Sequence, residues 1–361
     1  MYLSLALIIF PILGAALLAR TKAQRNQSVI AIVFSAASLL FSVINLFLVQ
    51  NGGVLTWGIE SWGIFDSVLR IDSLSGLFSL FSSFVWLAAG IYMHTYMESE
   101  ERAQSLYLYY LITLGATQGI FLAGNFIILL VFFEIMALAS GAWVTFYETD
   151  EAEEAGALYH NLGVAAGVLI GVAIILLFFA KVGLRVGVAA LAPTNIVLFG
   201  LATLFLIIGF GIKAGMFPVH IWLPKAHPVA PTPSSALLSG VLLKTGAYGL
   251  VRTGQLVNWG HGNLIPWVGT LVVVLGIITM ILGVCLALLQ GNAKRLLAYH
   301  SISQMGYIIV GIGAALFLNQ NGAFGLAGAV FHSLNHALFK SALFFGVGII
   351  VMGTGEADLY K

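Results

Sequence analysis

The stretch NFIILLVFFEIMALASGAWVTFY, residues 125–147, holds one charged side chain, Glu134, in a largely apolar run. A run of about 20 such residues can cross a bilayer as a helix. The nearest helical neighbours, at positions 130, 131, 137 and 138, are Leu, Val, Ala and Leu, so none can pair with the carboxylate. An unpaired carboxylate at bilayer depth is costly. We therefore expect a functional, proton-binding or pair-forming Glu134; the alternative is a purely structural ion pair between helices.

The whole chain has the composition of a membrane protein. Of its 361 residues, 60% are hydrophobic and 8% are charged, whereas soluble domains have about 45–50% apolar and about 25% charged residues. We expect an all-α, multi-pass protein of the cell membrane with about eleven spanning helices, whose ends are good to about 2–4 residues. The predicted spans are 3–19, 29–49, 74–95, 105–122, 123–147, 157–180, 194–217, 232–254, 265–290, 296–318 and 322–352.

Several function classes are excluded by what the sequence lacks. A net charge of +1 indicates no nucleic-acid partner, and Cys285 is the single cysteine, which leaves no internal disulfide or thiol-ligated metal cluster. No glycine-rich nucleotide motif is present. We expect no bound cofactor, no metal ion and no cofactor-based catalysis in this chain, so energy for transport comes from an ion gradient or another subunit.

Two spans are predicted to be discontinuous. Residues 206–224, LIIGFGIKAGMFPVHIWLP, place Gly and Pro around Lys213, and residues 227–240, HPVAPTPSSALLSG, hold three prolines within six positions. Gly and Pro interrupt helical hydrogen bonding, and broken helices at depth line protein or water-filled cavities and build ion sites. Lys213 is the natural partner for Glu134; the alternative is a lysine that extends to the membrane surface.

Lys244 lies about halfway along its own span, in SALLSGVLLKTGAYGLVR, residues 235–252. Burial in an apolar environment favours the neutral amine, so such a lysine can exchange protons. We expect it to be the central relay of a proton path.

A polar stripe is predicted near the end of the chain, in residues 331–345, FHSLNHALFKSALFF. His332, His336 and Lys340 recur every four residues and so share one helix face, where they could carry protons onward. HxxxH spacing also suits a metal, but no acid or cysteine is near in sequence. Secondary candidates for relay or proton uptake are Lys294, His300, His220 and His227.

These segments resemble the antiporter-like subunits of respiratory complex I, a family that includes multi-subunit sodium/proton antiporters and group 4 membrane-bound hydrogenases. The resemblance rests on LPKAHPVAPTPSSALLSGVLLKTGAYGLVR, VFFEIMALAS, GIKAGMFPVHIWLP, AKRLLAYHSISQMGY and HSLNHALFKSALFF, which agree in order and spacing. It implies the family carboxylate at Glu134, the broken-helix lysine at Lys213 and a role in proton translocation. The implied partners are other membrane subunits of a multi-subunit complex and peripheral redox subunits.

The resemblance also sets the expected organisation. The chain is predicted to be one membrane domain, 1–361, with peripheral N-terminal helices in 1–122, a first half-channel in 123–254 and a partial second half-channel in 265–361. Family members usually have about fourteen helices, so we expect a split, shortened or fragmentary member. The leading function is proton translocation in a redox-driven complex. The alternatives are a subunit of a sodium/proton antiporter and a non-transporting structural subunit.

Overall fold

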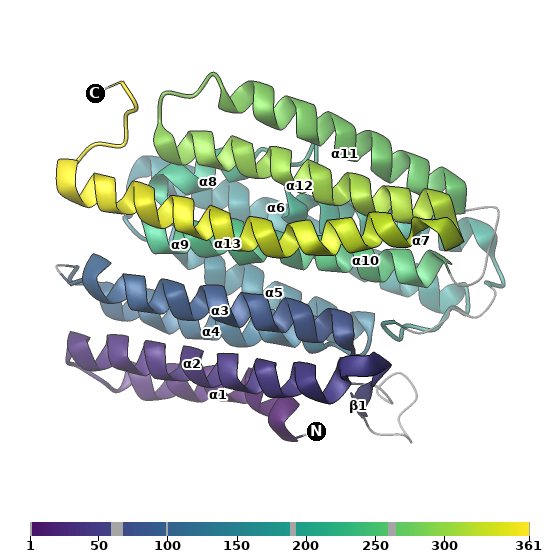
Figure 1. The fold of residues 1–361 in the computed structure, drawn as a ribbon, viewed down its shortest axis with the longest axis horizontal. Coiled ribbons are helices and arrows are strands. Elements are labelled where there is room, and N and C mark those ends of the chain that lie inside the picture. The colour runs from purple at the N-terminus through teal and green to yellow at the C-terminus, as the bar shows by residue number, and fades with distance from the viewer. Residues whose placement is uncertain (1, 59–67, 99, 188–192, 259–264, 361) are drawn as a thin grey trace.

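The computed structural model describes residues 2–58, 68–98, 100–187, 193–258 and 265–360. Its long helices run side by side along one direction, with the N-terminal helices at one edge of the bundle and α11 and α12 at the opposite edge (Figure 1). The helices are α1 (Tyr2–Ala19), α2 (Gln24–Val49), α3 (Ser73–Tyr96), α4 (Ala103–Leu122), α5 (Phe126–Val144), α6 (Asp150–Phe179), α7 (Ile196–Ala214), α8 (Leu223–Val229), α9 (Thr232–Leu237), the π-helix η3 (Leu238–Leu242), α10 (Leu243–Asn258), α11 (Ile265–Ala287), α12 (Ala293–Leu318) and α13 (Ala323–Thr354). Short 3-10 turns occupy Gln50–Gly52 and Asn319–Gly322.

The predicted membrane fold is confirmed, with a looser count of spans. Nine helices in the described part of the chain are long and apolar enough to cross a bilayer. The two remaining predicted spans are also helical: α1 is apolar but shorter, over Ser4–Ala19, and 232–254 is divided into α9, η3 and α10. Where a loop was expected, strands β1 (Leu55–Trp57) and β2 (Leu69–Ile71) form a small antiparallel pair with Leu55 opposite Ile71.

Side-chain caps fix where several helices begin. Asp72 and Ser75 form a capping box at the start of α3, in which each side chain accepts from the other's backbone N–H. Asn125, Thr149 and Asn195 cap α5, α6 and α7 in the same general way. Each cap satisfies one or two of the backbone N–H groups that have no partner within the helix, which favours a helix start at these residues.

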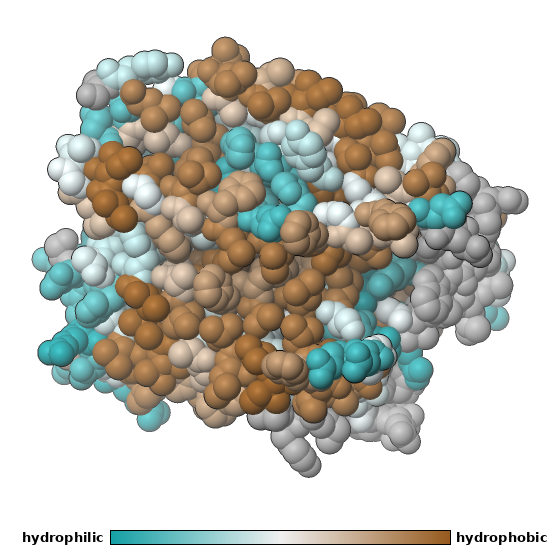
Figure 2. All heavy atoms as spheres, viewed as in Figure 1, coloured by the Kyte–Doolittle hydropathy of each residue, from teal (hydrophilic) through white to brown (hydrophobic). Residues whose placement is uncertain are grey.

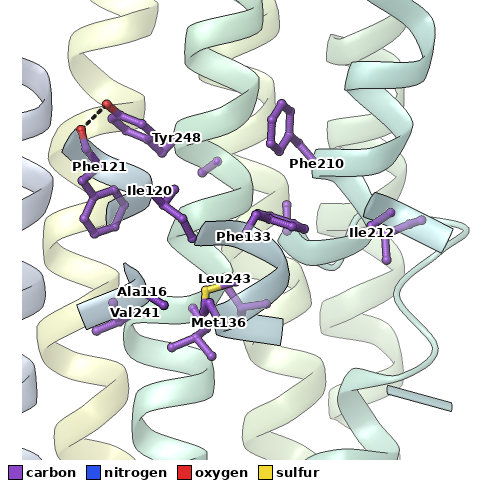
Figure 3. Packing of buried hydrophobic residues seen from close by; sticks show 14 of the residues in the cluster. Ala116, Ile120, Phe121, Phe133, Met136, Phe210, Ile212, Val241, Leu243 and Tyr248 are labelled. Atoms are coloured by element: carbon purple, nitrogen blue, oxygen red, sulfur yellow. Dashed lines mark hydrogen bonds between the residues drawn. The ribbon is translucent and has the colours of Figure 1, made fainter. Parts of the chain in front are cut away.

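The centre of the bundle is packed by large apolar side chains from α4, α5, α7 and α10 (Figure 3). The rings of Phe133 and Phe210 join α5 to α7 with centroids 5.8 Å apart. Tyr248 of α10 donates a hydrogen bond to the Phe121 carbonyl at the end of α4, over 2.7 Å. This core fixes α5, α7 and α10, the three helices that carry the first candidate residues, relative to one another.

The predicted interruptions are present. Helix α7 ends at Ala214, directly after Lys213, and Gly215 follows with φ 69°, a left-handed conformation that glycine adopts without steric cost. The chain then passes through α8 before the composite helix α9–η3–α10 begins. A π-helix inside a longer helix is rare and is often found at functional sites, and here it immediately precedes Lys244.

The face of the molecule that Figure 2 shows is largely apolar, as contact with a bilayer requires. In this view a hydrophilic patch interrupts the apolar face over α12 and α13. The half-exposed polar side chains of these two helices, away from their ends, include His300, Gln304, His332 and Asn335. Polar groups of this kind are unfavourable against lipid tails.

Candidate functional site

Glu134 lies in the middle of α5 against α6. Its Oε1 atom is buried and has no hydrogen-bond partner. The carboxylate packs on Gly167 of α6, where an added Cβ atom would overlap it. The glycine therefore provides the space that the carboxylate occupies. A buried carboxylate oxygen without a partner is unfavourable when charged, so a proton or an approaching cation stabilises it.

Lys213 occupies the last turn of α7 and is buried, with 4% of its surface exposed. Its Nζ atom donates a hydrogen bond to the Tyr159 hydroxyl of α6 over 2.5 Å. It also lies 4.6 Å from the ring centre of Tyr159 and 5.5 Å from that of Trp222. The ammonium group thus rests on two aromatic rings and one hydroxyl, a favourable setting for a cation.

Glu134 and Lys213 are near each other without touching. Their helices both pack on α6, and the two charges are close enough to attract each other. The ion pairs found in the described ranges of the chain do not include this pair. Direct pairing of Glu134 with Lys213 therefore stays a prediction.

Lys244 is completely buried at the start of α10. Its Nζ atom donates to the Ser239 carbonyl within η3, over 2.6 Å. The Ser239 hydroxyl is 2.7 Å from that of Ser301 on α12. The widened π turn thus supplies an acceptor for the lysine, and the serine pair leads from α10 toward α12.

Lys340 is buried on α13 and turns toward α12. Its Nζ atom donates to the Leu297 carbonyl over 3.1 Å and lies 2.8 Å from the His300 Nδ1 atom. The contact puts His300, predicted as a secondary candidate, in direct reach of the stripe. A lysine and an imidazole at hydrogen-bond distance can share one proton, since both have neutral forms.

The two histidines of the stripe lie beside Lys340 on α13. The His332 Nε2 atom is 2.9 Å from Gln304 Oε1 on α12, and the rings of His332 and His336 are stacked at 6.3 Å. His336 is fully buried, and neither of its ring nitrogens has a hydrogen-bond partner. The charge of Lys244 acts on both histidines, so the stripe faces the predicted central relay.

Two further candidates join this group, and one lies apart. Lys294 is buried and donates to the Ala230 carbonyl over 2.9 Å. His227 is fully buried, stacks on Phe344 at 4.8 Å and lies within the electrostatic reach of Lys294 and Lys340. His220 is half-buried in the connection after α7, where it packs near Phe217 at 5.8 Å.

The helices that carry Lys213 and Lys244, α7 and α10, are in direct backbone contact. A Cβ atom added at Gly246 of α10 would lie 2.5 Å from the Ala214 nitrogen and 2.6 Å from the Phe210 carbonyl oxygen. The backbone next to Lys213 therefore touches α10 just after Lys244. Hydrogen bonds that would link the two lysines are not found in the described residues, so a water chain must complete any proton path between them.

An ion pair that the sequence did not single out lies farther along α10. The Nη1 and Nη2 atoms of Arg252 donate to the two carboxylate oxygens of Asp72 over 2.8 and 2.7 Å. Arg252 also reaches Tyr248 and Gln255, each over 2.8 Å. Burial alone would raise the pKa of Asp72, but Arg252 and the Ser75 backbone hold that pKa well below its usual range. The pair ties the start of α3 to α10.

Sequence reasoning also missed hydroxyl groups that touch the lysines. Tyr159 contacts Lys213, and Ser239 contacts Lys244. The sequence does mark Tyr159 as one of few polar side chains in the span 157–180. Residue type alone, however, cannot distinguish a hydroxyl that lines a proton path from one that only hydrogen-bonds to the backbone of its own helix. Groups of three or more His, Cys, Asp or Glu side chains that could hold a metal do not occur within the described ranges.

Comparison with known proteins gives consistent matches. A family model described as "NADH:quinone oxidoreductase/Mrp antiporter, TM" matches residues 123–360. The chain is 36% identical to hydrogenase-4 component B of Escherichia coli strain K12 over 82% of this chain and 45% of that protein. It is 32% identical to a Na(+)/H(+) antiporter subunit of Alkalihalophilus pseudofirmus over 98% of this chain and 72% of that protein. The chain thus spans about half the length of the first relative.

Solved structures with the same fold are also known. A chain of the membrane-bound sulfane sulfur reductase, an archaeal respiratory membrane complex, superimposes with a TM-score of 0.81 at 27% identity, over 98% of this chain and 57% of that one. A chain of the Mrp complex from a Dietzia species gives a TM-score of 0.82 at 23% identity, over 96% of this chain and 64% of that one. The second likeness concerns the fold alone.

Proposed function

Because the chain belongs to the family of NADH:quinone oxidoreductase and Mrp antiporter transmembrane subunits, we propose that it translocates protons within a redox-driven membrane complex. The chain is a multi-pass membrane protein of antiporter-like type. The observation that supports proton transfer most directly is the state of Lys213, Lys244 and Lys340. All three are buried, and none has a carboxylate partner in an ion pair within the described residues.

Each group has a proposed role. Glu134 and Lys213, in the first half-channel of 123–254, form the input, where arrival of a proton changes the attraction between carboxylate and lysine. Lys244 is the central relay, because a buried lysine can lose and regain its proton. His332, His336 and Lys340, in the partial second half-channel of 265–361, receive the proton and pass it on.

The electrostatics of the second group support stepwise transfer. Lys244, Lys340 and His336 are close enough for their charges to repel one another. A proton on one of them therefore disfavours a proton on the next. Repulsion of this kind pushes a proton onward when another arrives. The same basic group extends toward the first turns of α12 through Lys294, His300 and His227.

The relatives named above are subunits or components of larger assemblies, which supports other membrane subunits as partners here. The hydrophilic patch over α12 and α13 in Figure 2 is our proposed contact face for another membrane subunit, since lipid tails would solvate the patch poorly. Peripheral redox subunits are proposed from the same relationship.

A sodium/proton antiporter is the second candidate, favoured by the match to the Alkalihalophilus pseudofirmus Na(+)/H(+) antiporter protein over 98% of the chain. Sodium prefers oxygen ligands, whereas the buried titratable groups of the candidate site are Glu134, several lysines and imidazoles. The chain itself therefore fits proton handling better, and in this alternative the sodium site lies in another subunit. Co-purification of redox subunits or of antiporter subunits alone separates the two candidates.

The decisive test is proton flux in membrane vesicles that contain the assembled complex. Lys244→Met removes the exchangeable proton, and Lys244→Arg keeps a charge that does not deprotonate in proteins. We expect both variants to assemble and both to lose flux, whereas Lys22→Met, at an exposed lysine, keeps it. Full flux in the Lys244→Arg variant would show that no proton passes through this position.

A further inference from the structure

The ammonium group of Lys213 donates to a tyrosine rather than to Glu134, the partner predicted from the sequence. The Tyr159 hydroxyl accepts from Nζ over 2.5 Å and lies 2.5 Å from the Ser140 hydroxyl of α5. Ser140 in turn donates to the Met136 carbonyl over 2.6 Å. The hydrogens can thus run in one direction, from the lysine through two hydroxyls to a backbone carbonyl.

We propose that Tyr159 and Ser140 form a second binding position for the ammonium group of Lys213, called the Tyr159 seat, which competes with binding to Glu134. The proposal rests on the proposed proton-transfer function, in which Lys213 is part of the input. Tyr159 is then a positioning residue. It touches the lysine and sets how much of the time the lysine is held away from the carboxylate.

The geometry of α6 supports two seats. Tyr159, Gly163 and Gly167 are spaced four residues apart, so they share one face of α6. Gly163 has only the Ala137 Cβ within contact, at 3.7 Å from an added Cβ, and Gly167 makes room for the Glu134 carboxylate. Between the hydroxyl and the carboxylate, α6 therefore presents glycines, and the small Ala137 of α5 faces Gly163, so no large side chain of α6 separates the two positions.

The energetics allow the seats to compete. Pairing with Glu134 would gain a strong attraction, but a buried ion pair also pays the desolvation of both partners, which can exceed that gain. At Tyr159 only one charged group, the lysine, is desolvated. There its ammonium group gains a hydrogen bond to a neutral hydroxyl and contacts with two aromatic rings. The Oε1 atom of Glu134, which has no hydrogen-bond partner, is the other binding position for the ammonium group.

The test is the position of the Lys213 side chain, determined by electron cryo-microscopy of the assembled complex. Tyr159→Phe keeps the ring and removes the hydroxyl, so we expect Nζ to move within ion-pair distance of Glu134. In Glu134→Gln it should stay on Tyr159. Tyr110→Phe is the matched control, because it removes another buried hydroxyl, bonded to the Trp86 carbonyl and Ser35, and should leave Lys213 in place.

Proton flux separates this inference from the function on which it rests. We expect Tyr159→Phe to lower flux about tenfold, the effect of a barrier change near that of one hydrogen bond. A lysine that moves while flux is unchanged in both Tyr159→Phe and Glu134→Gln would support the seat and contradict the input role. If Lys213 does not move in Tyr159→Phe, the seat is wrong whatever the flux. Should that variant fail to assemble, Ser140→Ala shortens the hydroxyl chain and must shift Lys213 in the same direction.

Discussion

Two buried cations lie two turns apart on the same face of α10, and their surroundings differ sharply. Arg252 uses both terminal nitrogens, on Asp72, Tyr248 and Gln255, and only its Nε atom lacks a partner. Lys244 has a carbonyl acceptor in η3, at 2.6 Å, and no ion-pair partner among the residues that the structure describes. The first cation is a guanidinium, which stays charged in proteins, and the Asp72 carboxylate compensates that charge. The second keeps both protonation states accessible, which is the property that a relay needs.

The difference also separates two uses of buried charge. A paired arginine holds helices together, because removal of either partner leaves a charge without compensation. An unpaired lysine contributes little to holding the fold and is free to exchange a proton. On α10 the Asp72–Arg252 ion pair lies next to the start of α3, and Lys244, the proposed relay, lies in the interior of the bundle. One helix therefore carries both a charge that is paired across helices and the lysine that we propose as the relay.

The comparison predicts its largest effect at the Asp72–Arg252 ion pair, called the clamp below. Asp72→Ala leaves Arg252, only 1% exposed at its side chain, without its carboxylate. We expect a loss of about 3–5 kcal/mol in the free energy of unfolding, as for other broken buried pairs. Thermal unfolding of the detergent-solubilised protein measures it as a drop in the unfolding midpoint.

A second variant checks that the loss comes from the unpaired arginine. The double variant Asp72→Leu with Arg252→Met removes both charges and should recover much of the lost stability, because apolar groups can replace a buried pair at small cost. If the double variant is as unstable as Asp72→Ala, then the unpaired charge of Arg252 is not the cause, and the loss comes from the missing α3 cap or from packing around Arg252.

The same clamp gives the next effect, through pH. The pKa of Asp72 lies well below its usual range in the folded protein, and in the unfolded chain it is near 3.9. The stabilisation is therefore fully present above about pH 4 and is lost as pH falls below it toward the folded value. We expect the gap between the unfolding midpoints of wild type and Asp72→Asn to narrow steadily as the pH falls from about 4 to about 2.5. A constant gap over that range would contradict the ion-pair explanation.

Sequence reasoning reached the fold and the titratable groups but not their contacts. The apolar runs, the glycines and prolines around Lys213 and the four-residue spacing of the α13 stripe are local patterns, and local patterns determine helices and their faces. Which hydroxyl accepts from Lys213 depends on how α6 and α7 pack, and nothing near Lys213 in sequence specifies Tyr159. Asp72 and Arg252 are 180 residues apart, and each also has an ordinary local explanation, as a helix cap and as a helix-end charge. The direct contact of Lys340 with His300 likewise joins two helices.

The smallest effect on stability is expected at Lys244, and it completes the comparison. Lys244→Met exchanges a fully buried amine for an apolar side chain of similar length, at the cost of one hydrogen bond to the Ser239 carbonyl. The lost hydrogen bond disfavours the variant by about 1 kcal/mol, and relief from burying an ionisable group without an anion offsets it. We expect the free energy of unfolding to stay within about 1 kcal/mol of wild type, although proton flux is lost. A large destabilisation on the scale of Asp72→Ala would mean that Lys244 is an anchor as well, with a partner that only the assembled complex or bound water supplies, and the distinction between the two ends of α10 would not hold.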